Sequence, residues 1–202
     1  IVLDALAIGT PFYGATTLSE ALTQRPSPIP ARTVAPETES LGRYPKTLTI
    51  ARRDLDSYAS MVGARSELLG PLERTLAISA ADELSLTERV TDAASVTTRL
   101  QDPFASISIP ASDTFTLGAR DAQIPLPIRS ELDYPVQVVI LFESNDRLDF
   151  PNDRIERTLE PGREVVSVQV QTQTSGDTPL RVTVRSPDDG VILAEGRYTV
   201  RS

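Results

Sequence analysis

Apolar and polar residues alternate in the C-terminal half of the chain, most regularly in the stretch EVVSVQVQ at Glu164–Gln171. A period of two predicts a β-strand with one face in the core and the other in water. A slip of one residue would bury the glutamines, so the pattern also fixes the register of the strand. The residues expected to face the core in this strand and the next are Val166, Val168, Val170, Val182 and Val184.

Further short segments of β character occur between 104 and 202. They are SISIP ending at Pro110, TFTL, QIPLPIRS, YPVQVVILFES, RIERTL and the terminal GRYTVRS. Turn residues separate the strands at 159–162, 174–177 and 187–190, and Gly190 is expected at positive φ. Seven or eight strands with these turns predict an immunoglobulin-like antiparallel β-sandwich.

Two of these segments carry more detailed predictions. Pro125 and Pro127 have no backbone N–H to donate, so we expect the edge of their strand on that side to lack a hydrogen-bonded neighbouring strand. In the next strand, Val138 and Ile140 share one face, while Val139 and Leu141 make the other face apolar as well. That strand is expected to be covered on both faces and to lie near the centre of its sheet.

The segment 46–103 has helical periodicity instead, and predicts a small helical hairpin or three-helix bundle. Gly70 and Pro71 are expected to bend or restart the second helix. Ser85 and Glu88 have the spacing of a capping box at the start of the third. The three predicted apolar stripes are Leu48, Ala51, Leu55, Ala59 and Val62; Leu68, Leu69, Leu72, Leu76 and Ala80; and Leu86, Val90, Ala94 and Leu100.

Residues 1–45 complete the predicted organisation, which is α+β. Six prolines in this segment block both helix and central strand, so we expect the end of an upstream domain followed by a proline-rich connector. The start at Ile1 has neither an initiator Met nor a basic leader, which indicates a piece of a longer protein. The predicted domains are 1–45, 46–103 and 104–202.

Composition narrows the class of function. The net charge of −8 argues against binding to nucleic acid or to anionic lipid. Lys46 is the one lysine among 20 basic residues, an arginine bias typical of GC-rich genomes. Zero His and zero Cys exclude a Ser-His-Asp or Cys-His nucleophile and the usual zinc sites. A Ser–Lys dyad would depend on Lys46, for which a solvated surface position is the simpler interpretation.

Carboxylates are the remaining reactive class. Asp146, Asp149 and Asp153 offer loop oxygens for calcium, but their spacing differs from that of an EF-hand and arginines interleave them. We interpret them as a solvated loop, and Asp188–Asp189 as turn residues. No pair among the 28 acids stands out as a glycosidase pair. We therefore assign no catalytic, cofactor-binding or metal-binding residue.

Two further sets of residues are candidates for ligand binding: a group of arginines and two tyrosines. If the last two strands are neighbours, their outward arginines would line one face and could bind an anion, although pairing with nearby acids is the simpler interpretation. These residues are Arg181, Arg185, Arg197 and Arg201. A carbohydrate-binding module would use exposed aromatics; there is no Trp, and Tyr134 and Tyr198 fall in turn or strand positions.

Three stretches resemble the C-terminal part of an actinobacterial cell-envelope protein family of unknown function, commonly encoded beside the lipid II flippase MurJ (MviN). They are Thr114–Leu117, the strand pair IPLPIRSELDYPVQV and the ending SPDDGVILAEGRYTVRS. The start, LDALAIGTPFYGATTLSEAL, also resembles the middle of that family, where a barrel similar to polysaccharide deacetylases ends. In the family a membrane-spanning helix usually follows the terminal strand.

The resemblance implies an extracytoplasmic module tethered to the membrane by a following helix. Its expected partner is an envelope protein or a peptidoglycan-related ligand, with no nucleic acid. Three hypotheses follow: a non-catalytic structural or protein-docking module, a carbohydrate- or peptidoglycan-binding module, and an accessory part of a deacetylase-like enzyme with its active site upstream. The first is favoured because the residues of known catalytic arrangements are missing.

Overall fold

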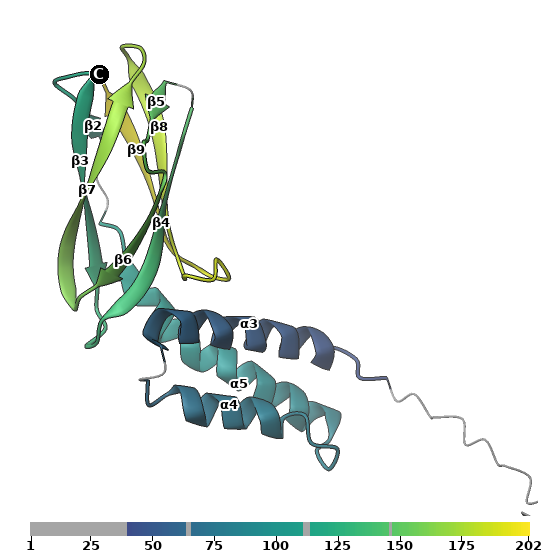
Figure 1. Cartoon of the computed structure of the whole chain (residues 1–202). Helices are drawn as coiled ribbons and strands as arrows, with labels where there is room; N and C mark the ends of the chain where they lie inside the picture. The colour runs from purple at the N-terminus through teal and green to yellow at the C-terminus, as the bar shows by residue number, and fades with distance from the viewer. Residues whose placement is uncertain (1–39, 64–65, 111–113, 146) are drawn as a thin grey trace, which may run out of the picture. The chain divides into compact units, whose positions relative to one another are not determined.

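The computed structural model describes residues 40–63, 66–110, 114–145 and 147–202. In these residues three helices come first and nine strands follow (Figure 1). The helices are α3 (Tyr44–Val62), α4 (Leu69–Ile78) and α5 (Leu86–Ala105). Most of the segment 1–45 lies outside the described residues, and the predicted domain boundaries remain predictions.

Local sequence explains where the helices start and stop. Pro45, expected in the connector, instead occupies the first turn of α3, where its missing N–H breaks no helical hydrogen bond. Gly63 ends α3 with a φ of 63°. The Ser85–Glu88 capping box is confirmed: the Ser85 N–H donates to Glu88 Oε2 over 2.9 Å, and Ser85 Oγ accepts from the Glu88 N–H.

The predicted apolar stripes were partly wrong. Leu86 opens α5 and is 38% exposed, and Ala94 is only half-buried, whereas Ala93 is fully buried. The face of α5 that packs on α3 and α4 is rotated from the predicted one. The sequence of α5 does not show this, because several small residues on its surface resemble core positions. In the second helix, Leu68 and Ala80 fall just outside α4 and are exposed.

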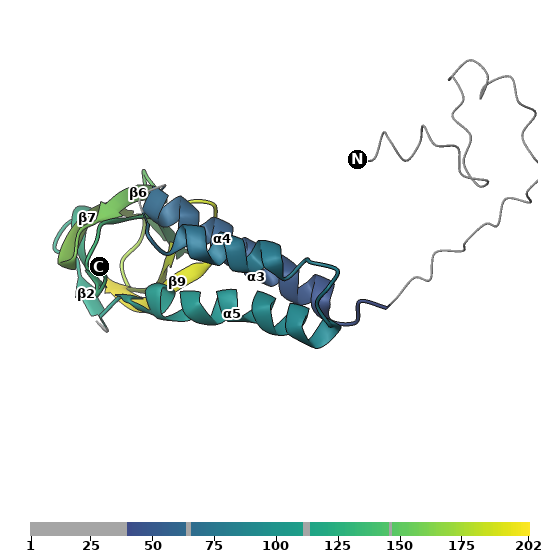
Figure 2. The ribbon, with the colours of Figure 1, turned by 90° about the horizontal axis from the view of Figure 1, so that it is seen from below.

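The strands form two facing sheets, seen end-on in Figure 2. One sheet has the order β1 (Ile107–Ser108), β3 (Asp121–Ser130), β7 (Gly162–Thr172), β5 (Leu148–Asp149). The other has the order β2 (Thr114–Thr116), β9 (Ile192–Arg201), β8 (Asp177–Arg185), β4 (Val136–Ser144), β6 (Arg154–Leu159). The predicted α+β architecture with an immunoglobulin-like sandwich is confirmed, although β2 pairs with β9 in parallel.

The core between the sheets follows the predicted alternation. The residues expected to face the core are all buried, with at most 6% exposed, and Ser167 and Gln169 face water. They are Val166, Val168, Val170, Val182 and Val184, together with Val138 and Ile140 of β4. β4 lies near the sheet centre, as predicted, between the central strand β8 and the edge strand β6. Val139 on the other face of β4 is buried as well, whereas Leu141 is half-buried.

The helices pack at the end of the sandwich that holds the β3–β4 turn and the β8–β9 loop (Figure 1). Met61 of α3 is buried in the sandwich core, and Val62 and Phe104 contact both the sandwich core and the core of the bundle. Residues 40–202 therefore form one unit. No helix among the described residues is both long and apolar enough to span a membrane.

Candidate functional site

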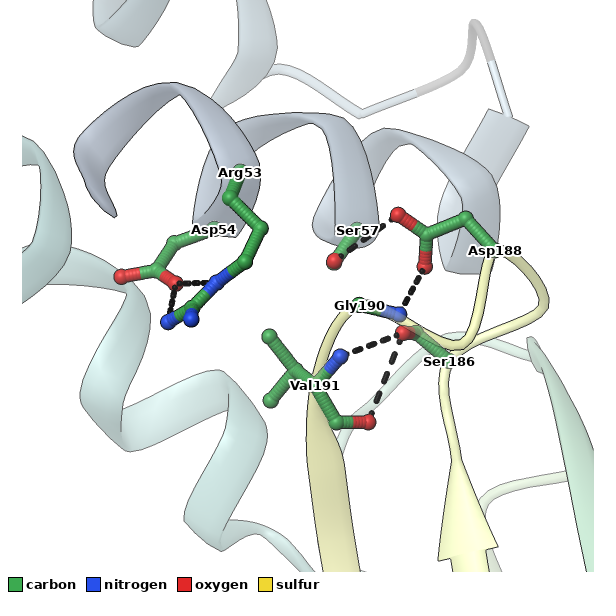
Figure 3. Close-up of polar contacts among 7 residues, drawn as sticks. All are labelled: Arg53, Asp54, Ser57, Ser186, Asp188, Gly190 and Val191. Carbon is green, nitrogen blue, oxygen red and sulfur yellow. Dashed lines mark hydrogen bonds and ion pairs between the residues drawn. The ribbon is translucent and has the colours of Figure 1, made fainter. Parts of the chain in front are cut away.

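The β8–β9 loop makes a polar contact with the bundle through Asp188. Its Oδ2 accepts a hydrogen bond from Ser57 Oγ over 2.9 Å, and its Oδ1 accepts one from the Gly190 N–H over 3.1 Å (Figure 3). Ser57 is fully buried on α3. The two oxygens of one carboxylate thus hold the loop in shape and attach it to a helix 131 positions earlier in the chain.

The loop conformation differs from the prediction. Asp189, not Gly190, has the positive φ, at 60°. Gly190 is required for another reason: a β-carbon there would collide with the Ser57 hydroxyl and lie 2.8 Å from Asp188 Oδ2. The close approach of the loop to α3 therefore explains the glycine.

The second aspartate ties the same loop to the sandwich. Arg154 of β6 donates to both carboxylate oxygens of Asp189, at 3.2 and 3.0 Å. Asp188 and Asp189 are turn residues, as predicted, but each also fixes the loop to a different neighbouring element.

The hydrogen bonds change the acidity of Asp188. Partial burial by itself raises the pKa of the carboxyl group, but hydrogen bonding by Ser186, the Gly190 N–H and Ser57 outweighs it, and the pKa lies below the ordinary 3.8. The charged form is therefore stabilised by folding.

This shift predicts a pH dependence. Because the folded-state pKa is lower than the unfolded one, the contribution of Asp188 to stability is complete above the unfolded pKa and is lost as pH falls through the folded pKa. We expect Asp188→Asn to lower the melting temperature at neutral pH, and the difference from wild type to shrink below pH 3.8. Thermal melts across the acid range measure this, with the exposed Asp153→Asn as control; a difference that is independent of pH would contradict it.

A second contact joins bundle and sandwich through two tyrosines. The hydroxyls of Tyr58 on α3 and Tyr134 in the β3–β4 turn lie 2.8 Å apart, and that of Tyr58 is 3.1 Å from Ser66 Oγ. The Tyr58 ring is completely buried and meets Phe104 of α5 edge-on. Burial, followed by the hydrogen bond with Tyr58, raises the pKa of Tyr134, so its hydroxyl stays protonated and cannot act as a base.

A pocket of about 870 Å³ opens beside this tyrosine pair. Its apolar part comes from the end of α3 and from Pro135, and its polar part includes the side chains of Glu67 and Asp133. The described lining residues are Met61, Val62, Gly63, Ser66, Glu67, Leu68, Asp133, Tyr134, Pro135, Gln137 and Thr158. We name this region, together with the Asp188 contact, the helix–sandwich junction; it presents apolar and hydrogen-bonding groups around the pocket.

The structure describes two of the three candidate calcium ligands. Asp149 and Asp153 are exposed on either side of the β5–β6 connection, and Asp146 lies outside the described residues. No group of three acidic side chains in the described part of the chain is arranged to hold a metal ion.

β8 and β9 are neighbours, as the prediction for their four arginines required, but Arg201 and Arg185 lie at opposite ends of the pair. Arg181 and Arg197 are directly opposite each other, and Glu195 accepts from both. Arg201 pairs with Asp177 over 2.8 Å. Arg185 is half-buried and its Nε has no hydrogen-bond partner among the described residues. Pairing with acids thus accounts for three of the four.

The other residues considered lie apart from the junction, except Tyr134. Tyr198 is buried against Phe115, with ring centroids 5.0 Å apart, and is not exposed for stacking on a sugar. Lys46 is exposed in the first turn of α3. The residues that sequence reasoning missed are Ser57, which has no distinctive motif, and Asp188, whose turn signal concealed its contact with α3.

The fold and the junction define a class: a small α+β module in which a three-helix bundle is joined to the end of an immunoglobulin-like sandwich. The chain belongs to the family of unknown function DUF6049, which matches residues 15–202. No curated protein matches it.

Solved structures resemble about half of the chain. WR4, a C. elegans MSP family member, is 12% identical with a TM-score of 0.35, and the match covers 48% of this chain and 98% of that one. The CARDB domain of PF1109 from Pyrococcus furiosus, solved with di-metal ions, is 15% identical with a TM-score of 0.35, covering 48% and 89%. A PapD-like domain of human CEP192 is 14% identical with a TM-score of 0.33, covering 50% and 87%. Structural similarity at these identities and TM-scores assigns no ligand or partner to this chain.

Proposed function

We propose that this chain is a non-catalytic module of a membrane-anchored cell-envelope protein, which spaces and docks other parts outside the cytoplasm. The observation that carries the proposal is the helix–sandwich junction. Asp188 and the tyrosine pair join bundle and sandwich at two separate points, which suits a rigid spacer better than an enzyme that must open and close.

The chemistry of the junction supports the same view. Its central hydroxyl, on Tyr134, has a raised pKa, and the carboxylate of Asp188 is engaged by neighbouring donors. The Tyr134 hydroxyl therefore stays protonated, and the Asp188 carboxylate is a weaker base than an ordinary aspartate. The arginine bias of the sequence and its resemblance to envelope proteins encoded beside MurJ support an actinobacterial, extracytoplasmic setting with a membrane anchor following the module.

A labelling experiment tests the location. The chain has no cysteine, so a cysteine placed at exposed Gln173 is unique within it. In the full-length protein, we expect Gln173→Cys to react with a membrane-impermeant maleimide in intact cells. Val168→Cys, buried in the core, is the matched control and should react only after unfolding. Labelling of Gln173→Cys only after lysis would contradict an extracytoplasmic location.

A binding experiment distinguishes the proposed spacer and docking role from that of a carbohydrate-binding module. We expect the purified chain not to sediment with peptidoglycan and not to bind lipid II. The accessible aromatic nearest a pocket is Tyr134, so Tyr134→Ala is the informative variant. Saturable binding that Tyr134→Ala abolishes would instead favour a peptidoglycan-binding module. Binding would also be expected to resist high salt if sugar stacking carried it.

An accessory role in a deacetylase-like enzyme remains the third proposal. Its test is the activity of the full-length protein with and without residues 40–202. Loss of turnover on deletion, with the upstream part still folded, would support it.

A further inference from the structure

One edge of β7 has backbone hydrogen-bonding groups that no strand among the described residues pairs with. β3 covers one side of β7 over its whole length, from Gly162 to Gln171. On the other side, β5 pairs only with Gln171 and Thr172, at the end of the sandwich far from the helices (Figure 1). Among the described residues, no strand pairs with that side of β7 from Gly162 to Val170.

The backbone hydrogen bonds at the end of β7 show which backbone groups point to this edge. The Thr172 N–H donates to Arg120 on the β3 side, and the Gln173 N–H donates to Arg147 on the β5 side. Backbone groups of successive residues alternate between the two edges of a strand. The N–H and C=O groups of Val165, Ser167 and Gln169 therefore point to the open edge, and the side chains of these three residues are exposed.

The other edges of the sandwich carry protection that β7 lacks from Val165 onward, beyond the charged Arg163 and Glu164 at its start. β6 has the exposed charges Arg154, Glu156 and Arg157, β3 has its two prolines, and β2 is three residues long. In contrast, residues 165–176 include no charge and no proline, and Val165 is 51% exposed. Natural sheets blunt free edges with charge or proline, because a bare edge pairs with another strand.

The charges along the outer face of this sheet indicate which strand pairs with the open edge of β7. The row at the start of β7 holds Arg163 opposite Arg129, and Arg129 pairs with Glu131 over 3.4 Å. Among the described residues, Arg163 has no ion pair of its own, so it is the basic group of this row. The row at its end is acidic, since Asp121 and Asp149 flank Gln171 on either side. An antiparallel strand with the same sequence would meet opposite charge at both ends.

We propose that the β7 edge is the interface of a two-fold symmetric dimer of this chain. In an antiparallel pairing centred on Val166, Val165 lies against Ser167 of the partner subunit, and Arg163 lies beside Asp149 of the partner subunit. A two-fold axis repeats each contact, so both ends are satisfied at once. The antiparallel direction also sends the two helical bundles to opposite ends, where they do not collide. This pairing goes beyond the proposed function, because a rigid spacer can act as a monomer.

The test is sedimentation velocity of residues 40–202 from micromolar to near-millimolar concentration. We expect a monomer–dimer equilibrium in the wild type. Val165→Lys combined with Ser167→Lys should leave a monomer, while the matched control Gln123→Lys, on the same face but at β3, should dimerise normally. All three positions are exposed, so we expect these substitutions to leave the fold intact.

Charge reversal makes the test specific. Arg163→Glu and Asp149→Arg should each weaken the dimer by about tenfold or more, and the double variant should restore it. A wild type that stays monomeric throughout would overturn the proposal, as would a dimer that survives the two lysines or a double variant no stronger than the single ones. None of these outcomes bears on the labelling or peptidoglycan experiments, so the two proposals fail separately.

Discussion

We expect Val168→Asp to unfold the sandwich. Val168 is 2% exposed, in the middle of β7 and directly opposite Ile124 of β3. An unpaired carboxylate at this position costs several kcal/mol, which is on the order of the whole stability of a domain. The measurement is circular dichroism and thermal melting at neutral pH.

Gln123→Asp is the matched control for this substitution. It introduces the same charge into the neighbouring strand of the same sheet, but on the face exposed to water. Its melting temperature should stay close to that of the wild type. If Val168→Asp melted within a degree or two of the wild type, the register of β7 would be wrong.

Tyr58→Ala should have the second largest effect, about 3–5 kcal/mol of lost unfolding free energy, because it removes a fully buried ring. The loss should fall on the junction, since the ring packs on Phe104 and its hydroxyl meets Tyr134 of the sandwich. Hydrogen exchange would report it as faster exchange in α3 and in the β3–β4 turn, with the centre of β8 much less affected.

Tyr58→Phe separates packing from hydrogen bonding. It keeps the ring and removes only the hydroxyl, for a cost of about 1 kcal/mol. If the phenylalanine variant lost as much stability as the alanine variant, the hydrogen bond to Tyr134 rather than the packing would hold the junction. If neither variant altered exchange at the turn, Tyr58 would not connect the two parts.

Local patterns made much of the fold predictable. The alternating valines of β7 and β8 fall inside as predicted, because a period of two leaves only one register that keeps the glutamines in water. They are Val166, Val168, Val170, Val182 and Val184. The capping box at Ser85 forms because both of its hydrogen bonds lie within one turn of helix. The stripe of α5 was less predictable, because alanine and threonine at several surface positions make its apolar face ambiguous.

The sequence by itself therefore determined the class of every helix and of the strands other than β5, which lies where a solvated loop was predicted. It also determined the inward face of the long strands, since this depends on neighbours a few residues away. Only the tertiary structure decided which distant residues meet. Ser57 lies under Asp188 across 131 positions, and Gly190 is needed for that approach rather than for its own φ. The open edge of β7 also depends on strand order, because β5, two residues long, covers only its end. Contacts of this kind are set by how the sheets and the bundle pack, and no local pattern in the chain encodes them.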